Sequence, residues 1–193
     1  GSAKTEDATV IHLVAAGDVN VTDSIVASGG PNYDYKNTFL DVAHLLADAD
    51  VSILNLEGNL VGEPYGGTYF SAPQSMMQAL GDAGVDLVQL ANSYSINQGI
   101  SGLQATIKSV KQAGMEPLGV YPDTASFSKS KGFTMCDVNG VKVAFVAFTK
   151  GMDGMALPAS ADTAEGPRIM PRLADERSVY IIHSIMQDVI RRG

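Results

Sequence analysis

Short apolar runs alternate along this chain with longer segments in which apolar residues recur at helical spacing. The apolar runs are Val10–Ala16, Val51–Leu54 and Val85–Leu90, and the first has the continuous character of a strand buried on both faces. The segments between them, Phe39–Ala49 and Pro73–Ala83, are typical of amphipathic helices. This alternation predicts an α/β fold with a largely parallel core sheet.

The pattern continues beyond the third apolar run. Ser101–Ala113 has helical spacing, and Pro117–Val120 predicts a short fourth strand. Two further apolar segments, Gly132–Val138 and Val141–Thr149, flank Asn139-Gly140, a dipeptide favoured in tight hairpin turns. We therefore expect an antiparallel hairpin beside the parallel strands, so that the sheet is either mixed or doubled.

The two ends of the chain differ from this core. Residues Gly1–Asp7 are small and polar, and Lys150–Pro171 is rich in Gly, Pro, Ala and Met, which indicates a long loop. Ala174–Arg192 carries an apolar stripe at helical spacing, which predicts a C-terminal helix. We expect a flexible leader over residues 1–9 and a single domain over residues 10–193, a length that suffices for one full core.

Composition narrows the classes of partner. The 193 residues carry a formal net charge of −8, which argues against nucleic-acid binding because that activity needs a basic footprint. No apolar run approaches the roughly 20 residues of a membrane span. An acidic protein that handles an anionic substrate needs a local cation, which is either a metal ion or a basic cluster.

Polar signatures follow three of the predicted strands. They are Gly17-Asp18-Val19-Asn20, Asn55-Leu56-Glu57 and Asn92-Ser93-Tyr94. The carboxyl ends of parallel strands meet at one edge of a sheet, where α/β proteins place their ligands. The sequence therefore predicts one shared site at this edge.

The residue types in these signatures suggest separate roles. Asp18 and Glu57 are candidate catalytic carboxylates and candidate ligands of a divalent metal such as Mn²⁺, Zn²⁺ or Ca²⁺. Candidate substrate-binding residues are Asn20, Asn55, Asn92, Ser93 and Tyr94. The structural alternatives are a turn or capping aspartate at Asp18, a salt bridge at Glu57, and ordinary strand-to-helix loop chemistry at the third signature.

With these residues in order, the chain resembles the bacterial capsule-synthesis CapA (PGA_cap) family, which is linked to poly-γ-glutamate and is similar in fold to the calcineurin-like metallophosphatases. Gly17-Asp18-Val19 resembles the opening signature of that family, and Ala49-Asp50 followed by Asn55-Leu56-Glu57 resembles its second element. Later segments that fall in order are Phe70-Ser71-Ala72-Pro73, Ala83-Gly84-Val85-Asp86, Val138–Ala144 and Gly151–Pro158. The resemblance implies the N-terminal portion of a metallophosphatase-like α/β/β/α sandwich.

The third signature departs from the family pattern, which reads Ala-Asn-Asn-His with an aspartate three residues later. Asn92 keeps the first asparagine, whereas Ser93, Tyr94 and Asn97 replace the second asparagine, the histidine and the aspartate. In metallophosphatase-like sites the second asparagine binds a metal and the histidine donates a proton to the leaving group. The resemblance thus implies hydrolase ancestry with a degenerate site.

The family also continues with a strand that ends in His-Trp-Gly, an element that this sequence does not contain. His183 lies in the predicted C-terminal helix and is not expected to take over the role of that histidine. A missing strand would leave apolar surface uncovered, which predicts a homodimer, a protein partner or a rearranged C-terminal helix.

Three functions follow from the resemblance and the residues. The first is a CapA-like protein, extracellular or in the cell envelope, that serves capsule or poly-γ-glutamate biosynthesis with a degenerate catalytic site. The second is an active metal-dependent hydrolase of a phosphoester or a γ-glutamyl amide, with Asp18 and Glu57 at the metal. The third is a non-catalytic module that binds an anionic polymer or a cell-envelope protein. The replaced Asn-His pair favours the readings without catalysis.

Overall fold

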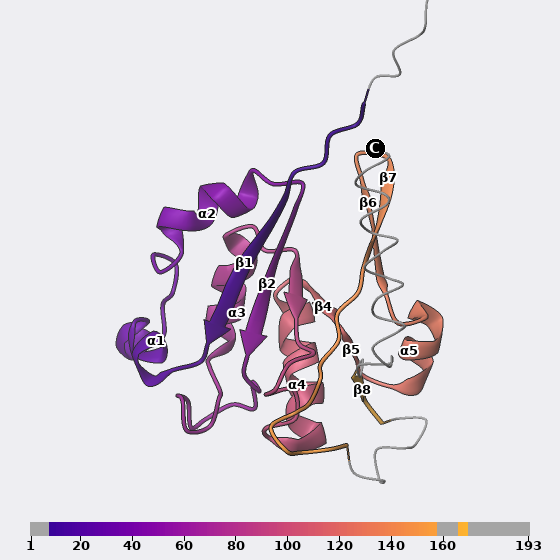
Figure 1. Cartoon of the computed structure of the whole chain (residues 1–193). Helices are drawn as coiled ribbons and strands as arrows, with labels where there is room; N and C mark the ends of the chain where they lie inside the picture. Colours follow the sequence, from indigo (N-terminus) through magenta and orange to yellow (C-terminus); the bar gives the residue numbers. More distant parts are fainter. Residues whose placement is uncertain (1–7, 158–165, 170–193) are drawn as a thin grey trace, which may run out of the picture.

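A parallel four-stranded sheet forms the centre of the computed structural model, which describes residues 8–157 and 166–169 (Figure 1). Its strands are β1 (Leu13–Asn20), β2 (Val51–Glu57), β3 (Leu87–Gln89) and β4 (Glu116–Leu118), in the spatial order β1-β2-β3-β4. Each neighbouring pair is parallel. The α/β class predicted from the alternation of strands and helices is confirmed.

Helices connect these strands in the order expected for parallel pairing. The three that the sequence predicts are α2 (Leu40–Ala47), α3 (Gln74–Asp82) and α4 (Gly99–Gln112), each within a few residues of its predicted bounds. Figure 1 shows α3 and α4 on the same side of the sheet. Three short helices were not predicted: α1 (Asp23–Ala27), the 3-10 helix η1 (Gly30–Asn32) and α5 (Thr124–Ser130).

The main hydrophobic core lies between the sheet and helices α3 and α4. Leu54 and Leu56 of β2 and Val88 of β3 point into it, because residues at alternate positions of a strand share one face. The helices supply side chains at helical spacing, namely Met76, Met77 and Leu80 from α3 and Leu103, Ile107 and Val110 from α4. This core fixes the face of β2 that is left for polar residues.

The opposite face of the sheet is partly covered by the antiparallel hairpin of β6 (Thr134–Val138) and β7 (Val141–Phe145). Val138 of the hairpin forms a small second core with Val51 and Leu87 of the sheet. Asn139 and Gly140 both have positive φ at the turn, as the dipeptide predicts. The predicted hairpin is therefore confirmed, but it forms a separate antiparallel sheet, so no sheet of the described residues mixes parallel and antiparallel strands.

A third small sheet was not predicted. It pairs β5 (Val120–Tyr121) with β8 (Arg168–Ile169) in antiparallel fashion. The positive φ of 82° at Gly119 separates β5 from β4, so the single strand predicted over Pro117–Val120 is divided between two sheets. β8 falls in the segment predicted as a loop, and its two residues are too few for a periodic signal.

The prediction for the first strand is wrong in position and in burial. β1 begins at Leu13 rather than Val10 and runs on to Asn20. Leu13 is 47 % exposed, and most of the strand is solvent-accessible rather than buried on both faces. The physical reason is that β1 lies at one end of the described sheet and pairs only with β2 in it.

Several predictions concern residues outside the described part of the chain. These are residues 1–7 of the leader predicted over residues 1–9, the helix over Ala174–Arg192 with His183, and most of the loop after Leu157. Among the described helices, none combines the length and the apolar character needed to cross a bilayer.

Candidate functional site at the carboxyl edge of the sheet

One extra residue in β1 decides which face of the sheet carries its polar side chains. Ala15 lies opposite Ile53, whereas Asp18 lies opposite Asn55, so β1 uses three residues where β2 uses two. Such a β-bulge reverses the alternation of side chains beyond it.

The packing of two valines confirms this reversal. Val14 and Val19 are five residues apart, and both pack against the helix-side core. In an uninterrupted strand, an odd separation would place them on opposite faces. Because of the bulge, Asp18 and Asn20 share the other face with the polar residues of β2, and both lie within β1 instead of following the strand as predicted.

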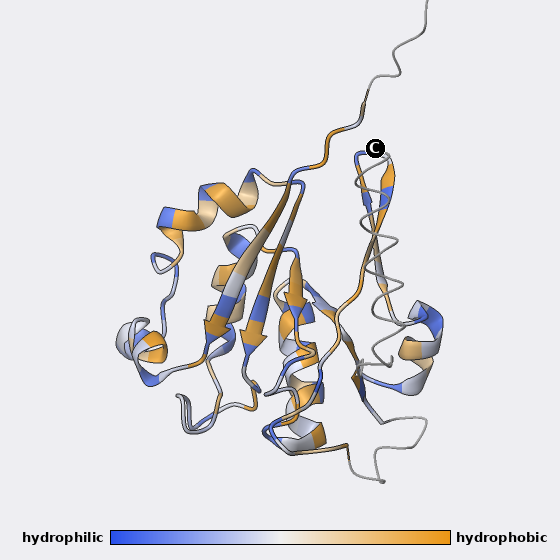
Figure 2. Ribbon diagram, in the orientation of Figure 1, coloured by the Kyte–Doolittle hydropathy of each residue, from blue (hydrophilic) through white to orange (hydrophobic). Residues whose placement is uncertain are grey.

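A chain of hydrogen bonds joins the three polar signatures. The Asn55 Nδ2 atom donates to Asp18 Oδ1 at 2.8 Å. The Asn92 Nδ2 atom donates to Asn55 Oδ1 at 3.0 Å and to the carbonyl of Leu56 at 2.8 Å. We call Asp18, Asn55 and Asn92 the strand-edge network. Figure 2 shows the polar segments of β1 and β2 close to the ends of both strands.

Glu57 extends this polar face by one more position of β2. It lies two residues beyond Asn55 and opposite Asn20 of β1, so all three share the face of Asp18. Burial raises the pKa of the Glu57 carboxyl, and the negative charge of Asp18 raises it further. The two candidate catalytic carboxylates therefore lie close enough to repel each other.

The loop after β3 is held by two residues that the sequence reasoning missed. The Ser95 hydroxyl donates to the carbonyl of Leu90 and accepts from the Asn92 backbone N–H at 2.9 Å. The buried Asn59 donates through Nδ2 to the Ser95 carbonyl at 3.1 Å and accepts from the Gln98 N–H at 2.7 Å. Ser and Asn are common in turns, so nothing in the local sequence marks Ser95 and Asn59 as residues that hold this loop.

Ser93 and Tyr94, which stand where the family pattern that the sequence resembles has Asn-His, have different environments. Ser93 is exposed, and the Tyr94 ring stacks on the Phe70 ring with centroids 4.7 Å apart. The backbone N–H of Tyr94 donates to Asn92 Oδ1 at 2.9 Å. The loop therefore presents a hydroxyl and an aromatic wall beside the strand-edge network.

Gln89 is a further polar residue at this edge that the sequence reasoning missed. It lies opposite Asn55 in the sheet, and its Nε2 atom donates to the carbonyl of Ala91 at 3.1 Å. Its Oε1 atom is buried with no hydrogen-bond partner among the described residues. A glutamine at the end of the apolar run Val85–Leu90 was the available signal.

The donor set at this edge does not fit a closed metal site. It offers the carboxylates of Asp18 and Glu57, while the amide oxygens of Asn55 and Asn92 already accept hydrogen bonds. Within residues 8–157 and 166–169, no three His, Cys, Asp or Glu side chains come together in a metal-binding group. The described residues at this edge therefore supply two carboxylates and no closed set of metal ligands.

Asp50 and Asp86, which belong to segments that carry the family resemblance, lie away from this site. Asp50 accepts hydrogen bonds from the His12 N–H at 2.7 Å and from Asn139 Nδ2 at 3.1 Å, and these bonds lower its pKa. Asp86 accepts from the Ser52 N–H at 2.8 Å. Each carboxylate precedes a strand, β2 or β3, and binds a backbone N–H of the neighbouring segment, so both have a structural role.

Comparison with known proteins identifies the same family that the order of the motifs indicated. Residues 12–184 match the family described as "Bacterial capsule synthesis protein PGA_cap". The chain belongs to this family. The predicted α/β fold class agrees with this membership.

Individual proteins of known sequence match only part of this PGA_cap chain, with about a quarter to a third of the aligned residues identical. It is 32 % identical over 81 residues to the capsule biosynthesis protein CapA of Bacillus anthracis, a match that covers 42 % of the chain and 19 % of CapA. It is 26 % identical over 140 residues to the proteins y4sH and y4uA of Sinorhizobium fredii, covering 68 % of the chain and 29 % of each relative. The chain thus spans less than a third of the length of these relatives.

Proposed function

We propose that this chain serves capsule synthesis at the cell envelope by binding a glutamate polymer at the strand-edge network, without hydrolysing it. The observation that carries the proposal is that hydrogen bonds within the protein alone hold Asp18, Asn55 and Asn92 in place. A site preorganised in this way needs no metal ion to define its shape. Membership in the capsule-synthesis family supports the choice of polymer.

The chemistry of the edge suits the backbone of a γ-linked glutamate chain. The N–H groups of such a chain would donate to the carboxylates of Asp18 and Glu57, which act as acceptors when ionised. Its carbonyl groups would accept from the amide of Asn20 and the hydroxyl of Ser93. The Tyr94 ring, held by its stack on Phe70, would contact the methylene groups.

Calorimetric titration with a γ-linked glutamate oligomer tests this proposal. The Asp18→Ala variant should bind about 10- to 100-fold more weakly, since a hydrogen bond to a charged group contributes about 1.5–3 kcal/mol. Asp41→Ala removes an exposed aspartate from α2 and serves as the control, with unchanged affinity expected. Equal binding by the chain and the Asp18→Ala variant would exclude the strand-edge network as the polymer site.

A second candidate is the metal-dependent hydrolase of a phosphoester or γ-glutamyl amide. The observation in its favour is the raised pKa of Glu57 next to Asp18, because two carboxylates that repel each other would be relieved by a cation. Titration with Mn²⁺, Zn²⁺ and Ca²⁺ separates the two functions. Tight metal binding that Asp18→Ala abolishes, together with hydrolysis, would establish the hydrolase in place of the binding function.

The extracellular or cell-envelope location and the homodimer belong to the same proposal. Large apolar side chains of α2 support self-association, since Leu40, Val42 and Leu45 are 61 %, 44 % and 55 % exposed. A protein partner of the cell envelope could cover the same surface.

A further inference from the structure

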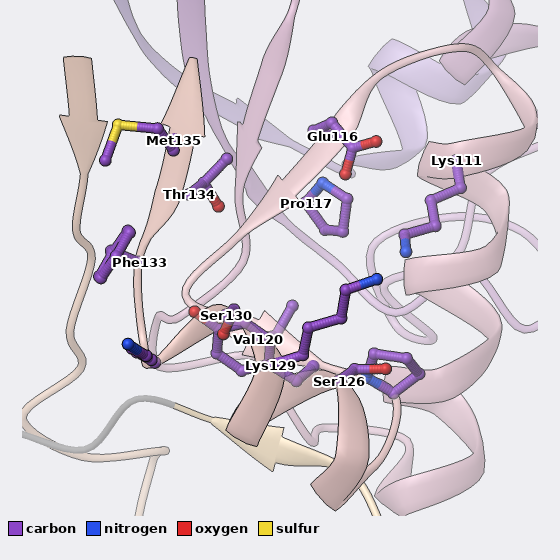
Figure 3. Close-up of a pocket in the computed structure, with 13 residues that line it drawn as sticks. Lys111, Glu116, Pro117, Val120, Ser126, Lys129, Ser130, Phe133, Thr134 and Met135 are labelled. Atoms are coloured by element: carbon purple, nitrogen blue, oxygen red, sulfur yellow. The ribbon is translucent and has the colours of Figure 1, made fainter. Parts of the chain in front are cut away.

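A cavity of about 640 Å³ lies between α4, β4, α5 and β6, and no residue of the strand-edge network lines it. Its lining combines ammonium groups, hydroxyl groups and apolar side chains. Lys111 comes from α4, and Lys129 comes from α5. Figure 3 shows these two lysines extending toward each other from their separate helices.

Positive charge dominates this cavity in an otherwise acidic chain. Lys111, Lys129 and Lys131 face one carboxylate in the lining, that of Glu116. The whole chain has a formal net charge of −8. A cavity in which ammonium groups outnumber carboxylates attracts anions, and its walls weaken the screening by water.

The helix dipole explains why Lys111 and Lys129 each lie at a helix end. It does not explain why both side chains line the same cavity. Lys111 and Lys129 lie in the last turns of α4 and α5, where the helix dipole favours a cation. Asp123 caps the start of α5 by accepting from the Ser126 N–H at 2.7 Å, which fixes the direction of this helix. The dipole does not require the ends of two helices to meet at one cavity.

Tyr121 provides an independent indication of a ligand. Its side chain lines the cavity, is 7 % exposed and packs edge-on against Phe127 with ring centroids 5.2 Å apart. Its hydroxyl is buried and has no hydrogen-bond partner among the described residues. Buried polar atoms are nearly always hydrogen-bonded, so this unpartnered hydroxyl, in a residue that lines the cavity, favours a ligand that supplies an acceptor.

We infer that this cavity binds carboxylate groups of an acidic chain. Lys111 and Lys129 would bind successive carboxylates, and Val120 and Phe133 offer apolar walls for the methylene groups between them. A compact inorganic anion would leave these apolar walls unused. The cavity is inferred from its own lining, whereas the choice of a glutamate polymer as the acidic chain rests on the proposed function.

Binding of a γ-linked glutamate oligomer at low ionic strength tests the inference. The Lys111→Gln/Lys129→Gln double variant should bind about tenfold more weakly, because two charge pairs of up to about 1 kcal/mol each are lost. Lys36→Gln removes the same kind of charge from an exposed position preceding α2 and should leave the affinity unchanged. Equal affinity for the chain and the double variant would overturn the inference.

A second variant separates ligand binding from folding. Tyr121→Phe should weaken oligomer binding about three- to tenfold without lowering the free energy of unfolding, because the hydroxyl has no partner to lose within the described residues. Unchanged affinity in Tyr121→Phe would contradict a contact between the Tyr121 hydroxyl and the oligomer. Inorganic phosphate that binds the cavity more tightly than the oligomer would overturn the assignment to carboxylates.

These variants test the strand-edge proposal and the cavity proposal separately. Loss of binding in the lysine variant but not in Asp18→Ala supports the cavity and overturns the strand-edge proposal. Loss in Asp18→Ala alone does the reverse. An oligomer that does not bind the chain at all overturns both.

Discussion

Asn92 joins strands β2 and β3 through one side chain. Its Nδ2 atom donates to Asn55 and to the Leu56 carbonyl, and its Oδ1 atom accepts from the Tyr94 N–H. With both ends of the amide occupied, the side chain has one orientation, and Asn55 is in turn oriented toward Asp18. The order of the strand-edge network therefore depends on this residue.

Asn92→Ala should lower the free energy of unfolding by about 1–3 kcal/mol, because it leaves polar partners in the loop and in β2 without their hydrogen bonds. Denaturant unfolding measures this loss. Asn97→Ala, a change of the same size in the same loop, is the control and should have a much smaller effect. Equal stability of the two variants would contradict the importance of the network for this edge.

Glu57→Gln should raise the free energy of unfolding at neutral pH. The folded protein raises the pKa of Glu57, so the wild type loses stability as the pH rises above about 4.5, the ordinary glutamate value. The gain should be below about 1 kcal/mol because solvent screens the charges, and it should vanish at lower pH, where the carboxyl is protonated. Unfolding measured across this pH range tests the sign, and a variant less stable than the wild type at pH 7 would contradict it.

The sequence predicted part of this arrangement of residues. The spacing of Asn55 and Glu57 placed both on one face of a strand, and the structure confirms this geometry. The order of the strands placed Asp18 and Asn92 at the same edge. The β-bulge in β1 was not predictable, since Gly17 allows a bulge without requiring one. The catalytic and substrate-binding roles of these residues remain predictions.

Helices α3 and α4 end in the same way but in different surroundings. Gly84 follows α3 with φ of +102°, and an added Cβ would lie 2.7 Å from the Ala47 Cα atom at the end of α2. Gly114 follows α4 with φ of +81°, and an added Cβ would meet no atom within 4 Å. One glycine thus permits close packing of two elements, and the other only permits a turn.

Gly84→Ala should therefore destabilise the protein more than Gly114→Ala. A positive φ at alanine costs about 1–2 kcal/mol at either position, and only Gly84→Ala adds a clash with backbone. We expect Gly84→Ala to lose at least about 3 kcal/mol in denaturant unfolding. Equal losses of unfolding free energy in the two variants would contradict this prediction, because they would mean that α2 moves aside at no energetic cost.

At the scale of elements, periodicity predicted the long helices and missed the short ones. α4 has 14 residues and a repeated apolar face, whereas α1 and α5 have 5 and 7 residues, too few for a clear period. The burial of β1 was misjudged because it depends on how many strands pair with it, which its own residues do not encode. Asn139-Gly140 succeeded because a two-residue turn is a local property.

At the scale of the molecule, two polar regions of opposite character lie apart in the fold. The strand-edge network and Glu57 form an acidic edge at the ends of β1 and β2, whereas Lys111, Lys129 and Lys131 line a cavity near α5. In the two proposals, the acidic edge accepts hydrogen bonds from the N–H groups of a glutamate polymer, and the lysines of the cavity bind its carboxylates. A basic cluster is one of the two sources of positive charge expected for an acidic protein that handles an anionic substrate, and a metal ion is the other.

Nuclear magnetic resonance of the side-chain amides tests the central claim most directly. The amide signals of Asn55 and Asn92 report on the strand-edge network itself, because both groups are hydrogen-bonded within it. We predict that a γ-linked glutamate oligomer shifts both signals and that equimolar Mn²⁺ leaves them sharp. Broadening of both signals by Mn²⁺, with no shift on addition of the oligomer, would contradict the account and identify the edge as a metal centre.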